Sequence, residues 1–260
     1  MDITYPELWL LELGCKSDAS WLPVVWLDDT QRVQESGYNE QWNCPPNGLT
    51  VRGMARLLVD MQNRGLIEIW QVVNDEPSGV VVPKDCGELH AWLIDERRRL
   101  RGMIPWISRV PFHCVRVTAA GIARWEKYAH PDWSRYRGDF EGRLEAPGET
   151  VWTQSAMTEA FAREVLEVYG DDVFFPSTMH WETLQTTVHE PWDVFPGKRL
   201  PRGVTLTVNV TEYGPRSISC DDCELNAKNQ DQYRRFCNIC DWYERGVRNH
   251  PDRPLPTKRH

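Results

Sequence analysis

Four cysteines near the C-terminal end of the chain form two tight pairs with the spacing of metal ligands. Two residues separate Cys220 from Cys223, thirteen separate the two pairs, and two separate Cys237 from Cys240. A Cys-x-x-Cys turn aims two sulfurs at one ion, and two such turns complete a tetrahedral site of four thiolates. The spacing therefore predicts a structural Zn2+ site within residues 214–246.

Other uses of these four thiols stay open. An iron–sulfur cluster also takes four cysteine ligands. Disulfides would need an oxidising compartment, and a thioredoxin-like redox pair would need a βαβ setting that this region lacks. A site with only cysteine ligands leaves no position for water or substrate. We therefore expect the zinc to stabilise a segment that is too short to bury a core of its own.

Two histidines around a glutamate are the next candidates for chemistry. His180 and His189 flank Glu182, an arrangement that allows a hydrolytic or metal site. Histidines beside tryptophan in a region of strands and turns more often pack or face solvent. The sequence lacks the phosphate-binding loop, the dinucleotide-binding glycine pattern, Gly-x-Ser-x-Gly and His-Glu-x-x-His. We expect no catalysis and no small-molecule substrate, with an unrecognised hydrolase as the second alternative.

The composition is that of a globular protein. Of the 260 residues, 41% are hydrophobic and 26% are charged, which excludes disordered and collagen-like classes. No apolar run reaches the length of about 18 residues that a membrane span needs. The first residues lack the positive region of a signal peptide, so we expect a cytoplasmic protein.

The charge is unevenly distributed along the chain. The net charge is -8, yet residues 90–143 carry 11 basic and 6 acidic side chains. An acidic total argues against a protein that coats nucleic acid indiscriminately, because that binding depends on neutralising phosphates. A local basic face stays possible, although a solvated arginine-rich helix surface is the simpler interpretation.

Helix and strand signals are clearest between residues 50 and 130. Thr50 and Gly65 predict the two ends of a helix over 51–64. Its expected apolar face comprises Val51, Met54, Ala55, Leu58 and Met61. The expected strands are 66–73 and 112–117, with a second short one at 80–82 after a turn over 74–79. A capping box at Asp85 and a cap at Thr118 predict helices that follow them.

Beyond residue 130 the signals are sparser. The composition of residues 131–150 is typical of a linker, and 155–169 predicts a helix. Residues 204–211 alternate apolar and polar without a fault, which predicts a half-buried antiparallel strand. We therefore expect an α+β chain with three parts. These are an N-terminal domain over 1–145, a small α/β segment over 146–213, and a zinc-binding module of ribbon or knuckle type with a tail over 214–260.

The order of elements between residues 45 and 130 resembles a winged-helix domain. A helix ends in Gly65-Leu66-Ile67, a strand follows, and a later strand ends in Val117-Thr118-Ala119-Ala120-Gly121 at the start of a helix. The segment 74–110 is longer than a simple wing. Either the wing carries an insertion, or strand 67–73 pairs with 80–82 and the later strand belongs elsewhere.

The resemblance implies that helix 51–64 enters the major groove of DNA. Its exposed polar residues would then contact the nucleic acid: Arg52, Arg56, Gln62, Asn63 and Arg64. Winged helices also serve as protein-interaction modules.

Thirteen tryptophans suggest interaction surfaces. Four of them lie in polar, proline-adjacent or aspartate-adjacent stretches, where we expect exposure: Trp133, Trp181, Trp192 and Trp242. An exposed tryptophan marks an interface more often than a catalytic site. The sequence thus predicts a non-catalytic adaptor or regulator that acts through protein contacts, with a DNA-binding transcriptional regulator as the alternative.

Overall fold

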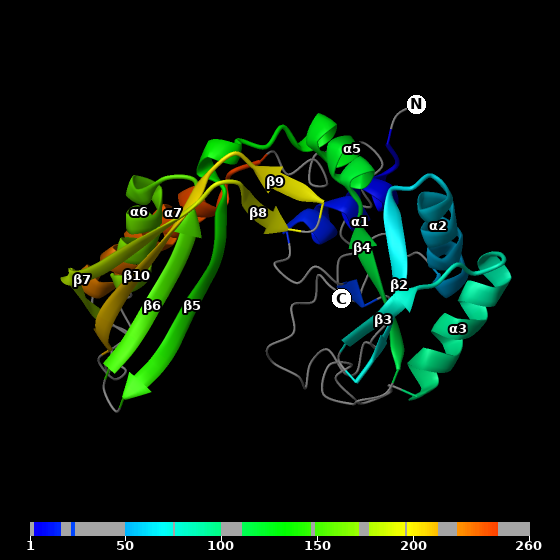
Figure 1. Cartoon of the computed structure of the whole chain (residues 1–260), viewed down its shortest axis with the longest axis horizontal. Helices are drawn as coiled ribbons and strands as arrows, with labels where there is room; N and C mark the ends of the chain where they lie inside the picture. The colour runs from blue at the N-terminus through cyan, green and yellow to red at the C-terminus, as the bar shows by residue number, and fades with distance from the viewer. Residues whose placement is uncertain are drawn as a thin grey trace. The chain divides into compact units, whose positions relative to one another are not determined.

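A computed structural model describes most of the chain. The described residues are 3–16, 22–23, 50–74, 76–99, 111–146, 149–171, 177–195, 197–212 and 223–243. They form helices and antiparallel sheets, which confirms the α+β class. The chain divides into unit 1 (Met1–Ala129, Phe195–Lys198 and Arg245–His260) and unit 2 (His130–Val194 and Arg199–Glu244), whose elements are labelled in Figure 1. Among the described residues, no helix is long and apolar enough to span a membrane.

Unit 1 combines helices with an antiparallel sheet whose strands differ in length. The described helices are α1 (Tyr5–Lys16), α2 (Val51–Asn63), α3 (Cys86–Arg99) and α5 (Ala119–Ala129). The described strands are β1 (Leu22–Pro23), β2 (Ile67–Val73), β3 (Glu76–Val80) and β4 (Phe112–Val117), in the order β1-β4-β2-β3. Helix α2 packs beside α3, and α1 packs beside α5 (Figure 1).

Local sequence explains the bounds of α2. The Thr50 hydroxyl accepts a hydrogen bond from the Gly53 N–H at 3.1 Å, which satisfies one of the free donors of the first turn. Gly65 adopts a φ of 68°, a left-handed conformation that few other residues tolerate, and the chain turns there into β2. The predicted helix is therefore confirmed, and four residues of its expected inner face are buried: Met54, Ala55, Leu58 and Met61. The fifth, Val51, is half-buried.

Strand β2 pairs on both of its sides. Ile67 lies opposite Val117 of β4, and Trp70 lies opposite Val80 of β3. Strand β2 thus pairs both with the later strand 112–117 and with β3, which contains only Val80 of the predicted strand 80–82. Residues 76–79, predicted as part of a turn, belong to β3.

A buried carboxylate joins three helices of unit 1. Glu7 of α1 is only 3% exposed. Its carboxylate accepts a hydrogen bond from the Arg64 Nη2 at 2.8 Å, just beyond the end of α2, and another from the guanidinium of Arg124 in α5. We call Glu7, Arg64 and Arg124 the Glu7 clasp.

Unit 2 is built on a second antiparallel sheet, in the order β5-β6-β10-β7. Its described elements are η1 (Trp133–Arg135), β5 (Arg137–Ala146), β6 (Glu149–Ala156), α6 (Glu159–Gly170), β7 (Ser177–His189), β10 (Gly203–Glu212) and α7 (Cys223–Cys240). A short hairpin of β8 (Trp192–Phe195) and β9 (Lys198–Leu200) lies between β7 and β10 in sequence. Helices α6 and α7 lie side by side on one face of the sheet (Figure 1).

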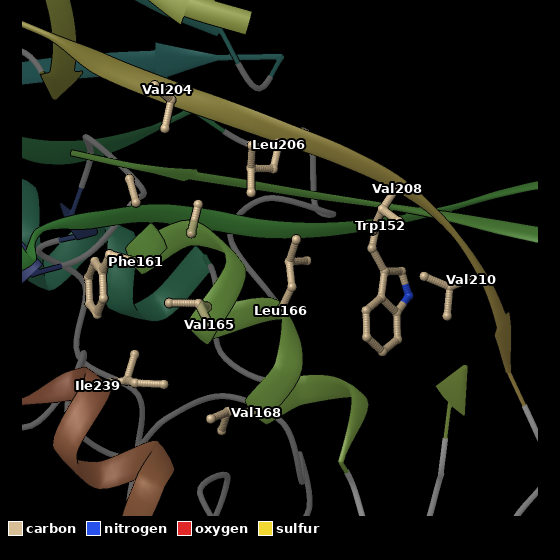
Figure 2. Close-up of a cluster of buried hydrophobic side chains, with 12 residues drawn as sticks. Trp152, Phe161, Val165, Leu166, Val168, Val204, Leu206, Val208, Val210 and Ile239 are labelled. Carbon is tan, nitrogen blue, oxygen red and sulfur yellow. The ribbon is translucent and has the colours of Figure 1, made fainter. Parts of the chain in front are cut away.

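The alternation of β10 creates the core of unit 2. Its four inward residues are buried, as predicted: Val204, Leu206, Val208 and Val210. Figure 2 shows them facing Val165 and Leu166 of α6, with Ile239 of α7 below. Because each fully buried aliphatic side chain contributes about 1.5–3 kcal/mol, this cluster is the main attachment of the two helices to the sheet.

Two predictions for the second half of the chain are wrong. Residues 137–146, predicted as linker, form β5, since a polar edge strand and a loop have similar compositions. The helix predicted from residue 155 begins at Glu159 instead. Ser155 and Ala156 still belong to β6, and Thr158 caps α6 by accepting from the Phe161 N–H.

The Glu7 clasp predicts a clear stability effect. We expect Glu7→Ala to lower the free energy of unfolding by about 2 kcal/mol, because it removes the anion that two partly buried guanidinium groups share. Urea unfolding followed by circular dichroism measures this change. Glu145→Ala is the matched control, since it removes a carboxylate from the exposed pair with Arg143 and should change stability by less than about 0.5 kcal/mol. Equal effects of the two variants would contradict the clasp.

Candidate functional site

The exposed face of α2 is a row of polar side chains. Arg52, Arg56, Asp60 and Asn63 are all exposed and follow one another at intervals of three or four residues, which places them on one side of the helix. Arg52 and Arg56 make no hydrogen bond or ion pair with any residue that the structure describes. Their charges are therefore available to a ligand.

The other two predicted contact residues of this helix have partners within unit 1. The Gln62 side chain donates to the Val81 carbonyl at 2.8 Å. Arg64 belongs to the Glu7 clasp, and hydrogen bonding to Glu7, with a second contribution from Asp60, raises the pKa of Arg64. Of the five residues predicted to contact nucleic acid, Arg52, Arg56 and Asn63 are exposed and make no bond to a described residue, whereas Gln62 is half-buried and the exposed Arg64 is paired.

The charge of Asp60 is compensated on this face. Its carboxylate accepts from Arg64 Nη1 at 2.9 Å. The first turn of α2 contains no acidic residue, and its backbone N–H groups add the positive end of the helix dipole. The N-terminal half of α2 is consequently the more positive half of this surface.

The three predicted metal ligands within the described residues do not come together at one point. Cys220 lies outside the described residues, Cys223 begins α7, and Cys237 and Cys240 lie in its last turn. At a rise of 1.5 Å per residue, the helix separates the backbones of Cys223 and Cys237 by about 21 Å. In a zinc site each cysteine sulfur lies only about 2.3 Å from the same metal ion. No three His, Cys, Asp or Glu side chains in the described ranges are grouped for a metal ion. Occupation of the site by zinc stays a prediction.

The ribbon or knuckle predicted within residues 214–246 is wrong over 223–240, where the chain is helical. The intervening residues include many good helix formers, and Phe236 and Ile239 face the core of unit 2. That helical signal is present in the sequence but is obscured by the spacing of the cysteines.

The predicted hydrolytic set is also dispersed. His180 Nδ1 lies 3.4 Å from Glu182, and His180 Nε2 lies 2.9 Å from the Thr211 hydroxyl. His189 instead bonds to Thr205, which lies six residues from Thr211 along β10, or about 20 Å. The two histidines therefore do not act at one site.

The expected exposure of two tryptophans is wrong. Trp192 and Trp242 are each only 9% exposed. Both contact Tyr136, and Trp133 packs half-buried against Trp242 with ring centroids 5.3 Å apart. Trp181, also half-buried, is covered by the Arg163 guanidinium at 4.2 Å. Residues that are distant in sequence cover these rings. The polar residues next to each tryptophan in the sequence therefore do not predict its burial.

A buried acid–imidazole pair in unit 1 has no signal in the sequence. Glu96 of α3 is 1% exposed, and its carboxylate is hydrogen-bonded to the Nδ1 of His113 of β4, whose backbone N–H also donates to Glu96 at 3.2 Å. Trp92 stacks on the His113 ring with centroids 4.9 Å apart. These contacts attach α3 to the sheet.

The thiol of Cys114, next to His113, has a raised pKa. Burial, with a smaller contribution from Glu96, raises the pKa of Cys114 to about 12 from an ordinary value of 9.0. Burial likewise raises the pKa of Cys15 far above its usual range. Both thiols are therefore protonated at neutral pH, where they are poor nucleophiles.

This predicts selective alkylation. In the native protein, iodoacetamide should leave Cys114 unmodified from pH 7.5 to 9.5, because the thiol stays protonated until the pH approaches 12. In urea the same thiol returns to its ordinary pKa, and its labelling should accelerate as the pH rises toward 9. Peptide mass spectrometry after timed labelling measures both rates. Rapid labelling of Cys114 in the native protein at pH 8 would contradict its burial.

Known proteins offer no guide to these sites. No protein-family model, no curated protein and no solved structure matches the chain.

Proposed function

We propose that this chain is a non-catalytic regulator that binds duplex nucleic acid through the exposed face of α2. The observation that carries the proposal is the pair Arg52 and Arg56, one helical turn apart and without a carboxylate partner among the described residues. Arg64, Arg99 and Arg199, by contrast, each pair with a carboxylate. Unpaired arginines on one helix face suit phosphates and guanine edges.

The order of elements in unit 1 supports a winged-helix-like role for α2. In that architecture the helix that enters the groove comes before the strands of the wing. Here α2 precedes β2, β2 pairs with β4, and β4 lies between β2 and β1. Strand β3 and helix α3 would then be an insertion within the wing.

The dimensions and charge of α2 fit a major groove. Its 13 residues span about 20 Å, and the groove is about 12 Å wide, enough for one helix. Because the chain has a net charge of -8, binding away from this face is disfavoured. We therefore expect modest affinity with a strong dependence on salt.

Fluorescence anisotropy with a labelled 24-base-pair duplex tests the proposal on the full chain. The double variant Arg52→Ala/Arg56→Ala should raise Kd at least about tenfold at 50 mM KCl. It should also reduce the slope of log K against log salt by about 2, since each lost phosphate contact removes about 0.9.

The matched control removes two arginines from exposed ion pairs of unit 2. Arg143→Ala/Arg202→Ala makes the same change in net charge, but those side chains pair with Glu145 and Glu190. The control should bind like the wild type. Equal losses in the two double variants, or no binding by the wild type at 50 mM KCl, would overturn the proposal.

Exposed valines at the edge of the unit 1 sheet favour protein contact as a second candidate function. Val80 at the end of β3 is 46% exposed and Val82 just beyond it is 73% exposed. In the described sheet β3 is the outermost strand, and such an edge accepts a strand from a partner. This would make the chain an adaptor.

A pull-down from the native host can test the adaptor function. A partner that the wild type retains and Val80→Lys/Val82→Lys loses supports it, because a lysine pair makes the edge repel an added strand. The Arg52→Ala/Arg56→Ala variant is the control and should retain that partner. Retention by the lysine variant would exclude this edge as the contact.

A further inference from the structure

We infer that α2 reads an adenine–thymine base pair in the major groove of B-form DNA, through Asn63 and Val59. The inference rests on the proposed function, because it assigns a base pair to the helix face that would bind nucleic acid. Asn63 and Val59 lie one turn apart in the second half of α2. The two arginines of the same face, Arg52 and Arg56, lie in the first half.

These four side chains form one stripe along α2. Successive residues of a helix are rotated by about 100°, which places all four within an arc of about 60°. The members of the stripe are Arg52, Arg56, Val59 and Asn63. The buried residues Met54 and Met61 lie on the opposite side of the helix, so the stripe can enter a groove without disturbing the core.

The amide of Asn63 is available to a ligand. Asn63 is exposed, and its side chain makes no hydrogen bond with any residue that the structure describes. The end of α2 does not need this side chain, because the Arg64 N–H bonds to the Asp60 carbonyl at 3.1 Å and Gly65 supplies the left-handed turn. The amide donor and the amide acceptor of Asn63 can therefore both serve a partner.

An asparagine amide matches the major-groove edge of adenine. Its NH2 group donates to N7 while its carbonyl oxygen accepts from the N6 amino group, and no other base offers this pair of groups. Val59 is half-buried, so part of its side chain reaches the surface beside Asn63. The thymine paired with adenine carries a methyl group on the same groove edge, which suits an apolar neighbour. The amide and the valine together thus match an A·T pair.

The arginines and the two neutral residues have different partners on the DNA. A guanidinium neutralises the charge of a phosphate, whereas a neutral amide or a valine gains little there. Arg52 and Arg56 therefore hold the helix on the backbone, which fixes its position but carries no sequence information. The shorter side chains of Val59 and Asn63 reach the base edges once α2 lies in the groove.

This arrangement selects DNA over RNA. The major groove of B-form DNA is about 12 Å wide and admits one helix. The major groove of an A-form RNA duplex is deep and narrow, and side chains cannot read it. An RNA duplex can therefore meet the charges of the arginines but not the amide of Asn63.

A selection experiment with the full chain tests the inference. The protein is incubated with DNA duplexes that carry a random centre of about ten base pairs, and the bound duplexes are sequenced. We expect an A·T pair to be enriched at a fixed position. On the selected duplex, Asn63→Ala should raise Kd about tenfold, and on an unselected duplex it should change Kd by less than about twofold. Asn209→Ala is the matched control, because it removes an exposed amide from β10 of unit 2, and it should bind both duplexes like the wild type.

Base analogues give an answer that does not depend on the folding of a variant. Replacing the selected adenine with 7-deazaadenine removes N7, and replacing its thymine with deoxyuridine removes the methyl group. Each replacement should weaken binding by the wild type. The first effect should vanish in Asn63→Ala and the second in Val59→Ala. Asn63→Asp should shift the preference toward cytosine, because a carboxylate accepts from the N4 amino group of that base.

The outcomes separate this inference from the proposed function. A selected pool without an A·T preference, from a wild type that still needs Arg52 and Arg56 for binding, would overturn the inference and leave the proposed function standing. Equal losses of Asn63→Ala on selected and unselected duplexes would do the same. Absence of binding to every DNA duplex would overturn both.

Discussion

A single buried carboxylate, that of Glu7, joins three of the four described helices of unit 1. Burying Glu7 without partners would cost several kcal/mol, and two guanidinium groups from other helices offset that cost. Because Arg64 is held in this way, α2 presents a fixed face to solvent. The clasp pairs Arg64, just beyond the end of α2, whereas Arg52 and Arg56 in its first half have no described partner, so the free positive charge of this helix lies toward its N-terminal end.

In unit 2 the unbroken helix α7 determines how far apart the described cysteines lie. A helix is a stiff rod, and each residue added along it increases the distance between side chains at its two ends. The spacing of the two cysteine pairs favours one metal centre, whereas the helix separates Cys223 from the other two described thiols. Ile239, between Cys237 and Cys240, is buried in the core, and this contact fixes the orientation of the last turn.

The aromatic residues illustrate how burial depends on distant parts of the chain. Trp192 packs against Gly203, where a Cβ atom would lie 2.2 Å from the ring, so only glycine fits there. Trp242 is covered by Tyr136 from more than a hundred residues away in sequence. Two of the four tryptophans that the sequence placed at the surface are therefore internal, whereas Arg52 and Arg56 of α2 and the valines near the end of β3 are exposed.

The sequence alone determined the elements whose signals are local. The cap and stop residues of α2, the helix after Thr118 and the alternation of β10 follow from interactions within a few residues, and the structure confirms them. Tertiary structure decided which side chains are free. Arg64, Trp192 and Glu96 each have partners far away in sequence, and β5 is a strand only because β6 pairs with it. Charge pairing, ring packing and strand pairing are non-local, so no window of sequence contains both partners.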